Sequence, residues 1–286
     1  MKTTPVMKKA FAKVNLFLNV VGRRTDGYHD LEMINARIDL FDELTFTPGG
    51  TRPVTITSND KFLENQNNLV YKIACHLMET YSPTSQVSID LVKRIPAGAG
   101  LGGNSADAAA VIQGLDELFE WGLSDETMQA IALRFGADIP YCLSTRPALV
   151  EGIGERITPL DLDLSGYHVL FANPKVFVST ESVFQAGDGS GYPVYPIQPA
   201  LSAARRNDVE TLINHLQNGL QEITFSLSPA TRALYEDLIR TLGPRGVVMT
   251  GSGSTILKVF KTATPDITRY CRLYSDKYLL SIYSFL

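Results

Sequence analysis

Apolar and polar residues alternate along much of the first half of the chain. Alternation with a period of two predicts β-strands, because successive side chains of a strand point to opposite faces. The predicted strands are 12–21, 32–40, 43–47, 54–57 and 87–92. The first has an apolar face formed by Ala12, Val14, Leu16, Leu18 and Val20. Its other face, which we expect to be open to solvent or to a ligand, carries Lys13, Asn15, Phe17 and Asn19.

Helical periodicity and turn-forming residues organise the rest of the chain. The predicted helices are 68–80, 105–118, 124–135, 201–216 and 229–242. Residues 187–199 are rich in Gly, Pro and Tyr and predict a loop or the wall of a cleft. Strands largely precede helices, which favours an α+β fold over a doubly wound sheet. A change of composition near residue 160 predicts two domains, 1–160 and 161–286.

Composition narrows the class of protein. The chain has 286 residues, 44% hydrophobic and 20% charged, as in ordinary folded proteins. A net charge of -4 argues against a nucleic-acid partner, and no segment reaches the roughly 20 apolar residues of a membrane span. Three widely spaced cysteines indicate reduced thiols. We expect a cytoplasmic protein with a small-molecule partner, no membrane, and a monomeric or weakly dimeric state.

A glycine-dense run opens directly into an alanine-rich helical segment. Its four glycines are Gly98, Gly100, Gly102 and Gly103. Glycine adopts positive φ and lets bare backbone N–H groups approach a ligand. The following helix directs its N-terminal amides and the positive end of its dipole to the same place. The run therefore predicts an anion site, most often for phosphate.

Three interpretations of this run compete. The spacing G-x-G-x-x-G fits a dinucleotide site, but a second helix rather than a second strand follows the first. A purely structural glycine turn remains open. The run also lacks the lysine of the G-x-x-x-x-G-K-[S/T] loop, so a metal ion or a distant residue must neutralise a bound triphosphate. Ser105 is a candidate ligand of that metal or a cap of the helix, and both roles can hold together.

Two other segments place polar groups where chemistry is possible. After the first strand, a turn at 22–29 carries Asp26, Tyr28 and His29, and a tyrosine at the edge of a cleft can stack on a base. Asp138 lies between Gly136 and Pro140. With Pro140 first in a helix, Ile139 would be the cap and Asp138 would precede it. Its carboxylate would then be available as a general base or as a partner for a lysine.

Together these motifs resemble the GHMP small-molecule kinases over nearly the whole chain. The matching segments are 10–18 with its Lys-x-Asn strand, 24–29 with Asp-Gly-Tyr-His, 96–110, 136–140, 151–155 and 250–254. The resemblance implies a two-domain α+β fold with an N-terminal nucleotide-binding domain and a C-terminal ferredoxin-like substrate domain. It also implies phosphorylation, dependent on ATP and Mg2+, of the 2-hydroxyl of a cytidine diphosphate-linked methylerythritol.

Residue roles follow from the same resemblance. Asp138 would accept the hydroxyl proton, and Lys13 would hold that carboxylate ionised. The implied substrate contacts are Asn15, Asp26, Tyr28, His29, Thr180 and Phe184, with Tyr28 and Phe184 on either side of the cytosine. The implied nucleotide contacts are Asn68, Lys93, Pro96, Gly98, Gly100, Leu101, Gly102, Gly103, Asn104 and Ser105, and the implied metal ligand is Ser105.

The glycine run departs from the family pattern at two positions. Asn104 replaces a glycine and Ala106 replaces a serine. Asn tolerates left-handed φ, so we expect Asn104 to preserve the turn. The missing hydroxyl predicts weaker nucleotide affinity rather than another reaction. Two alternatives remain: another GHMP kinase acting on mevalonate, homoserine or a sugar, and a nucleotide-binding protein without turnover.

Overall fold

Two long strands, β1 (Val6–Arg23) and β2 (His29–Pro48), open the chain. A computed structural model describes residues 2–82 and 84–286. These residues form two compact units, and both strands contribute to each. Unit 1 comprises the segment that ends at Ala12, Leu40–Pro96 and Gly102–Thr145; unit 2 comprises Lys13–Asp39, Ala97–Leu101 and Arg146–Leu286. The division into sequence domains at residue 160 stays a prediction.

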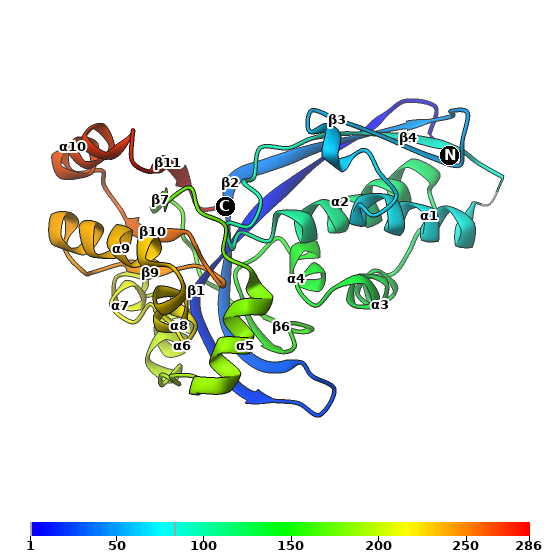
Figure 1. Cartoon of the computed structure of the whole chain (residues 1–286). Helices are drawn as coiled ribbons and strands as arrows, with labels where there is room; N and C mark the ends of the chain where they lie inside the picture. The colour runs from blue at the N-terminus through cyan, green and yellow to red at the C-terminus, as the bar shows by residue number, and fades with distance from the viewer. Residues whose placement is uncertain (1, 83) are drawn as a thin grey trace. The chain divides into compact units, whose positions relative to one another are not determined.

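Unit 1 is a helical layer on a small sheet. Strand β4 (Val87–Val92) pairs antiparallel with β2 and parallel with β3 (Val54–Ser58). Figure 1 shows the helices on one side of β3 and β4. They are η1 (Lys61–Leu63), α1 (Leu69–Tyr81), α2 (Gly103–Phe119), α3 (Asp125–Phe135) and α4 (Ile139–Leu143). Gly114 lets α2 approach the sheet closely, because a side chain there would overlap the ring of Phe46.

Unit 2 contains a second, antiparallel sheet in the order β11-β7-β10-β9. Its strands are β7 (His168–Asn173), β9 (Val247–Met249), β10 (Ile256–Phe260) and β11 (Leu279–Ser284). The short strands β5 (Ala148–Gly152), β6 (Arg156–Pro159) and β8 (Gln217–Asn218) extend the first sheet alongside β2 and β1.

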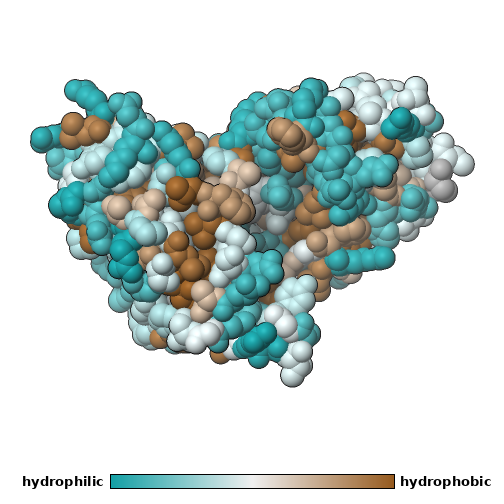
Figure 2. Space-filling view, in the orientation of Figure 1, coloured by the Kyte–Doolittle hydropathy of each residue, from teal (hydrophilic) through white to brown (hydrophobic). Residues whose placement is uncertain are grey.

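Six helices complete unit 2: α5 (Thr180–Ser190), α6 (Gln198–Arg205), α7 (Val209–Ile213), α8 (Gln221–Leu227), α9 (Pro229–Leu242) and α10 (Pro265–Tyr274). Helices α9 and α10 pack against the second sheet. The surface over α10 is mostly hydrophilic in Figure 2. This agrees with an amphipathic helix that buries Ile267 and Tyr270 toward the sheet.

Most predicted elements are confirmed within one or two residues, and the α+β class is confirmed. The separate strands predicted at 32–40 and 43–47 are wrong, because β2 runs through both. Asp42 interrupts the apolar pattern, but its buried carboxylate is hydrogen-bonded, so the strand continues. The helix predicted at 201–216 is wrong as a single element. Asn207 adopts φ +56° and Asp208 caps α7, which separates α6 from α7.

The stretch predicted as a loop at 187–199 is helical at its start, because α5 continues to Ser190. Gly187 gives room for the ring of Tyr192, which a side chain there would meet. Tyr192 also bonds to the backbone of this helix, at the carbonyl of Phe184 at 2.7 Å. Packing between the helix and the chain that follows it therefore overrides the low helical propensity of glycine.

Candidate functional site

The glycine loop has the backbone geometry expected of an anion site. Gly98, Gly100 and Gly102 adopt φ of +66°, +72° and +65°. Helix α2 begins at Gly103, and its N-cap residue, Gly102, has no side chain with which to bond the first amides. Those N–H groups and the positive end of the helix dipole point into the loop, where they attract an anion.

Three expectations about this loop are corrected. Gly103 is helical rather than left-handed, and its need for glycine is steric: a Cβ would lie 2.9 Å from Cγ2 of Ile95. Asn104 is also helical, so its tolerance of left-handed φ is not used. Ser105 is the third residue of α2, so the alternative in which it caps the helix is wrong.

Within unit 2, the glycine loop and the second glycine turn at 250–254 pack backbone to backbone. A Cβ on Gly100 would overlap the carbonyl of Thr250, and a Cβ on Gly251 would lie 2.9 Å from the oxygen of Gly100. The Oγ1 of Thr250 accepts a hydrogen bond from the backbone N–H of Asn15 at 3.0 Å. Two motifs about 150 positions apart in the sequence therefore form one structure.

Lys13 and Asn15 lie on β1 beside these turns. Lys13 bonds through its backbone N–H to the carbonyl of Leu101 at 3.0 Å, and its ammonium donates to Oδ1 of Asn15 at 3.0 Å. The same Oδ1 accepts from the N–H of Gly251, and Nδ2 of Asn15 donates to Oδ1 of Asn35 at 2.7 Å. Asn35 and Thr250 lie in segments that the sequence analysis singled out, 32–40 and 250–254, but neither was assigned to the site, because their contacts with Asn15 form only in the folded chain.

The polar face of β1 is buried, so the interpretation as a solvent-exposed face is wrong. Lys13 is 5% exposed and Asn15 1%, and Phe17 and Asn19 are buried as well. The side-chain amide of Asn19 makes two hydrogen bonds to the backbone of Tyr195: Nδ2 donates to the carbonyl oxygen at 2.7 Å, and Oδ1 accepts from the N–H at 3.0 Å. Buried polar groups need such partners, which makes this face a hydrogen-bonded framework.

Asp138 precedes α4 in unit 1. The helix starts at Ile139 with Pro140 second, which places Asp138 at the N-cap and corrects the predicted start by one residue. Its side chain nevertheless accepts no capping hydrogen bond from α4. The carboxylate is therefore not used for capping, as predicted. Lys13 belongs to unit 2, and its convergence with Asp138 stays a prediction.

A cluster around His29 occupies unit 2. The ring of His29 stacks on Phe184 with centroids 4.7 Å apart, and its Nε2 lies 2.7 Å from Oδ1 of Asp188. The hydroxyl of Tyr192 also donates to that carboxylate, at 2.9 Å. The hydrogen bond from His29 lowers the pKa of Asp188, and burial raises the pKa of Tyr192. Sequence reasoning missed Asp188 and Tyr192, because both fall in the stretch predicted as a loop.

The remaining predicted substrate contacts lie in unit 2 as well. Tyr28 is 56% exposed, and its backbone N–H donates to Asp26 at 3.1 Å. That hydrogen bond is the main cause of the lowered pKa of Asp26. Thr180 begins α5, and its hydroxyl lies 2.8 Å from that of Ser252 in the second glycine turn. These contacts place Thr180, but not Tyr28 or Asp26, beside the turn.

Two predicted nucleotide contacts already have protein partners in unit 1. Asn68 caps α1, with Oδ1 accepting from the N–H of Val70 at 2.9 Å. The ammonium of Lys93 lies between Oδ2 of Asp42 at 2.5 Å and Oδ2 of Asp107 at 2.7 Å. Sequence reasoning missed both aspartates: Asp42 lies 51 positions from Lys93, and Asp107, only 14 positions away, falls in the helical part of the glycine-dense run, where no local pattern pairs it with the lysine.

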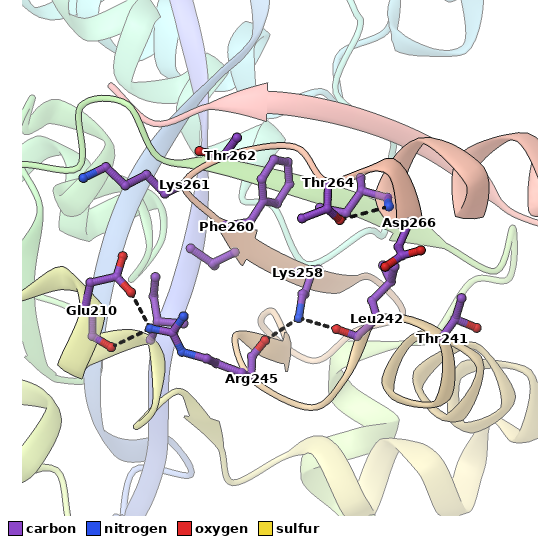
Figure 3. Close-up of a pocket in the computed structure, with 13 residues that line it drawn as sticks. Glu210, Thr241, Leu242, Arg245, Lys258, Phe260, Lys261, Thr262, Thr264 and Asp266 are labelled. Atoms are coloured by element: carbon purple, nitrogen blue, oxygen red, sulfur yellow. Dashed lines mark hydrogen bonds and ion pairs between the residues drawn. The ribbon is translucent and has the colours of Figure 1, made fainter.

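A separate cavity of about 460 Å³ in unit 2 is not lined by any predicted site residue. Figure 3 shows Arg245 directed at Glu210 and the ammonium of Lys258 directed at backbone oxygens. Lys258 donates to the carbonyls of Leu242, Gly243 and Arg245, and burial lowers its pKa. Lys258 therefore satisfies carbonyls at and just after the C-terminal end of α9, and none of the predicted site residues lines this cavity.

Comparison with known proteins identifies the class. The GHMP kinases N terminal domain matches residues 68–146, and GHMP kinases C terminal matches residues 200–273. The chain belongs to the GHMP kinases and is a small-molecule kinase, with ATP as the phosphate donor that the family implies. Helix α3 follows α2 where a dinucleotide site needs a strand, so that interpretation is excluded.

Individual relatives show which members of this family the chain resembles. Proteins named 4-diphosphocytidyl-2-C-methyl-D-erythritol kinase from Lachnospira eligens and Lachnoclostridium phytofermentans are 37% and 38% identical, over 88% of this chain and 88% and 87% of theirs. A crystal structure of 4-(cytidine 5'-diphospho)-2C-methyl-D-erythritol kinase superposes with a TM-score of 0.78 at 32% identity, covering 98% of this chain and 99% of that one. Homoserine kinase from Cytophaga hutchinsonii, at 17% identity and TM-score 0.75, shares the fold.

Proposed function

We propose that the chain transfers the terminal phosphoryl group of ATP to the 2-hydroxyl of 4-diphosphocytidyl-2-C-methyl-D-erythritol. The products are the 2-phosphate and ADP, in non-mevalonate isoprenoid biosynthesis. The observation that carries the choice of substrate is identity of 37% over 88% of the chain to relatives named for this reaction. The uncapped start of α2 at the glycine loop supports the phosphate-handling part of the proposal.

The nucleotide phosphates would lie at the glycine loop. The amides that follow Gly102 lack a capping side chain there. The positive φ of Gly98 and Gly100 shapes the loop, and the absence of a side chain at these positions leaves room for the ring of Phe177 and the carbonyl of Thr250. Contacts from Pro96, Leu101 and Asn104 belong to the same proposal. Asn68 and Lys93 would approach the nucleotide from unit 1.

Mg2+ fits this arrangement as a partner of the nucleotide. In the described part of the chain, no group of three or more His, Cys, Asp or Glu is placed to hold a metal ion. Mg2+ in kinases is bound mainly by phosphates and water, with one or two protein oxygens. The hydroxyl of Ser105 would supply one such oxygen, and its place in the first turn of α2 supports this role. When bound, the ion would neutralise phosphate charge.

Catalysis would depend on positioning and on one base. Asp138 would take the proton of the 2-hydroxyl, and the ammonium of Lys13 would favour its ionised form. The hydrogen bond from Lys13 to Asn15 fixes the direction of that ammonium, and Asn15 is itself tied to Gly251 and Asn35. Phosphoryl transfer gains mainly from such preorganisation.

The cytosine would bind at the His29 cluster. Tyr28 offers an exposed ring for stacking, and Phe184 would form the opposite wall. Because Asp188 bonds to Nε2 of His29, we assign Nδ1 to the edge of the base. Asn15, Asp26 and Thr180 would contact other parts of the substrate. A cytidine group gives this cluster a purpose that mevalonate, homoserine or a sugar would not.

A direct activity comparison tests the function. The purified chain is incubated with Mg-ATP and each of four acceptors: the cytidine-bearing substrate, mevalonate, homoserine and galactose. Release of ADP only with the first supports the proposal. Phosphorylation of another acceptor without the first, or nucleotide binding without turnover, contradicts it.

The proposal also includes the cellular location and the oligomeric state of the protein. No helix among residues 2–82 and 84–286 is long and apolar enough to cross a membrane. Cys75, Cys142 and Cys271 form no disulfide with one another, which supports a reducing compartment such as the cytoplasm. A monomer or weak homodimer, acting without nucleic acid, is the assembly that we expect.

A further inference from the structure

Unit 1 holds the partly buried side chain of Lys93 against two buried carboxylates, beside the segment that enters the glycine loop. The ammonium of Lys93 bonds to Asp42 at 2.5 Å and to Asp107 at 2.7 Å. Asp42 is fully buried and Asp107 is 2% exposed. Burying a charged group costs free energy unless it is well paired and hydrogen-bonded. A stabilising effect alone is therefore a poor explanation for this cluster. We call Asp42, Lys93 and Asp107 the loop-base triad.

The triad fixes the segment that enters the loop. Oδ1 of Asp42 accepts hydrogen bonds from the backbone N–H of Arg94 at 2.5 Å and of Ile95 at 2.8 Å. Asn59 holds the preceding residue: its Oδ1 accepts from the N–H of Lys93, and its Nδ2 donates to the carbonyl of Lys93. The backbone of 93–95 is thus bonded by side chains from outside the loop.

The triad also fixes the helix that leaves the loop. Asp107 lies near the start of α2, and Gly103 at its first position packs against Ile95 and lies close to the ammonium of Lys93. The lysine therefore links the entry segment to the helix whose amides face the loop. Residues 96–102 span the distance between these two anchored ends.

The charges make this linkage more than a packing contact. Burial raises the pKa of Asp107 to about 7, while burial alone would lower the pKa of Lys93 and the two carboxylates raise it. Oδ1 of Asp107 has no hydrogen-bond partner among the described residues. Leaving one carboxyl oxygen without a hydrogen bond costs stability. This cost indicates that Asp107 serves to hold Lys93 rather than to stabilise the fold.

We propose that Asp42 and Asp107 are positioning residues for nucleotide binding, which act by clamping Lys93 between the two ends of the glycine loop. This rests on the proposed function, because it assigns the loop to ATP. Lys93 then holds the two segments of unit 1 that flank the loop, in addition to any contact with the nucleotide.

The test compares Asp107→Asn and Lys93→Met with the unaltered chain. Binding of Mg-ATP is measured by calorimetry, and KM is measured for ATP and for the cytidine-bearing substrate. Each variant should raise the ATP dissociation constant about tenfold, with the substrate KM changed less than about twofold, because the side chains act on the nucleotide loop as one network. The double variant should bind ATP no more weakly than the weaker single variant.

Glu117→Gln is the matched control. Glu117 is on the same helix and pairs with Lys2 and Lys8 at 2.6 Å, but it lies at the far end from the loop. This variant should bind ATP normally. If Asp107→Asn destabilises the fold, Asn59→Ala provides a second probe, because it loosens the exposed entry segment without altering a buried charge.

The possible results distinguish failure of the clamp from failure of the proposed function. If the unaltered chain binds Mg-ATP but Asp107→Asn and Asn59→Ala bind it equally well, the clamp is wrong while the proposed function stands. If only Lys93→Met weakens binding, Lys93 contacts ATP directly and the clamp is again wrong. If the unaltered chain binds no ATP, the proposed function fails first.

Discussion

The ammonium of Lys13 donates a hydrogen bond to Oδ1 of Asn15, 3.0 Å away and two residues along the same strand. Asn15 connects this lysine to the second glycine turn through Gly251 and to β2 through Asn35. The side chain that we assign to catalysis is therefore aimed by a buried amide rather than by exposed flexible groups. Its orientation depends on the integrity of this network.

Asn15→Ala should damage both stability and turnover. The change leaves the N–H of Gly251 and the side chain of Asn35 without their buried partner, which costs about 1–3 kcal/mol. Turnover should fall about tenfold or more as Lys13 loses its alignment. Urea unfolding and steady-state kinetics measure the two effects. An unfolding free energy within about 0.5 kcal/mol of the original would show that the network is not needed.

Asp138→Asn should abolish turnover and leave ATP binding intact. The amide keeps the shape of the carboxylate but cannot take the proton of the 2-hydroxyl, and a lost general base costs about 100- to 10,000-fold. Single-turnover kinetics and calorimetric binding of Mg-ATP separate the two steps. A variant with near-normal turnover would rule out this residue as the base.

Asp188→Asn should weaken binding of the cytidine-bearing substrate and not of ATP. The change removes the carboxylate that bonds to Nε2 of His29 and to Tyr192. We expect the substrate KM to rise about tenfold, as for other residues that orient a histidine from behind. Glu181→Gln, on the same helix, is the control and should change neither KM. Equal effects on both KM values would contradict the cytosine site.

The pH dependence of stability should report the buried charge of Asp107. Burial raises its pKa to about 7 from a reference of 3.8, so the native state binds this proton more tightly than the unfolded state. The resulting stabilisation is complete at pH values below the reference pKa and is lost as pH rises toward 7. Asp107→Asn removes this contribution.

Urea unfolding at pH 5 and pH 8 measures the difference. The unaltered chain should lose at least about 1 kcal/mol more than Asp107→Asn between these values, since one pKa unit corresponds to about 1.4 kcal/mol. The variant places a neutral amide of nearly the same shape at this position, so its unfolding profile lacks the titration of Asp107. Parallel profiles for the two proteins would show that Asp107 titrates normally.

Local patterns predicted the elements and motifs of this chain well. The glycine loop, the polar residues of β1 and the segment around Asp138 are all contiguous, and each motif has a direct physical reason for its composition. Strand alternation placed Lys13 and Asn15 on one face correctly. It could not show that this face is buried, because burial depends on Thr250 and Asn35, which arrive from distant parts of the chain.

The parts that could not be predicted are those decided by tertiary partners. From the sequence alone, Asp42 indicates a break between two strands. Only its hydrogen bonds to Lys93, Arg94 and Ile95 explain why the strand continues through it. From the sequence alone, Asp188 falls in a predicted glycine-rich loop. In the structure it lies on α5 and bonds to His29. In both cases a polar side chain meets partners more than 50 positions away, and no local periodicity records such a pair.

The central claim is that this chain phosphorylates one hydroxyl of a cytidine-bearing acceptor. The most direct measurement is 31P NMR of the product formed from Mg-ATP and 4-diphosphocytidyl-2-C-methyl-D-erythritol. We predict one new phosphomonoester signal, matched by an equal amount of ADP and without coupling to a carbinol proton, because the 2-position carries no hydrogen. An unchanged acceptor spectrum with folded, ATP-bound protein would contradict the claim.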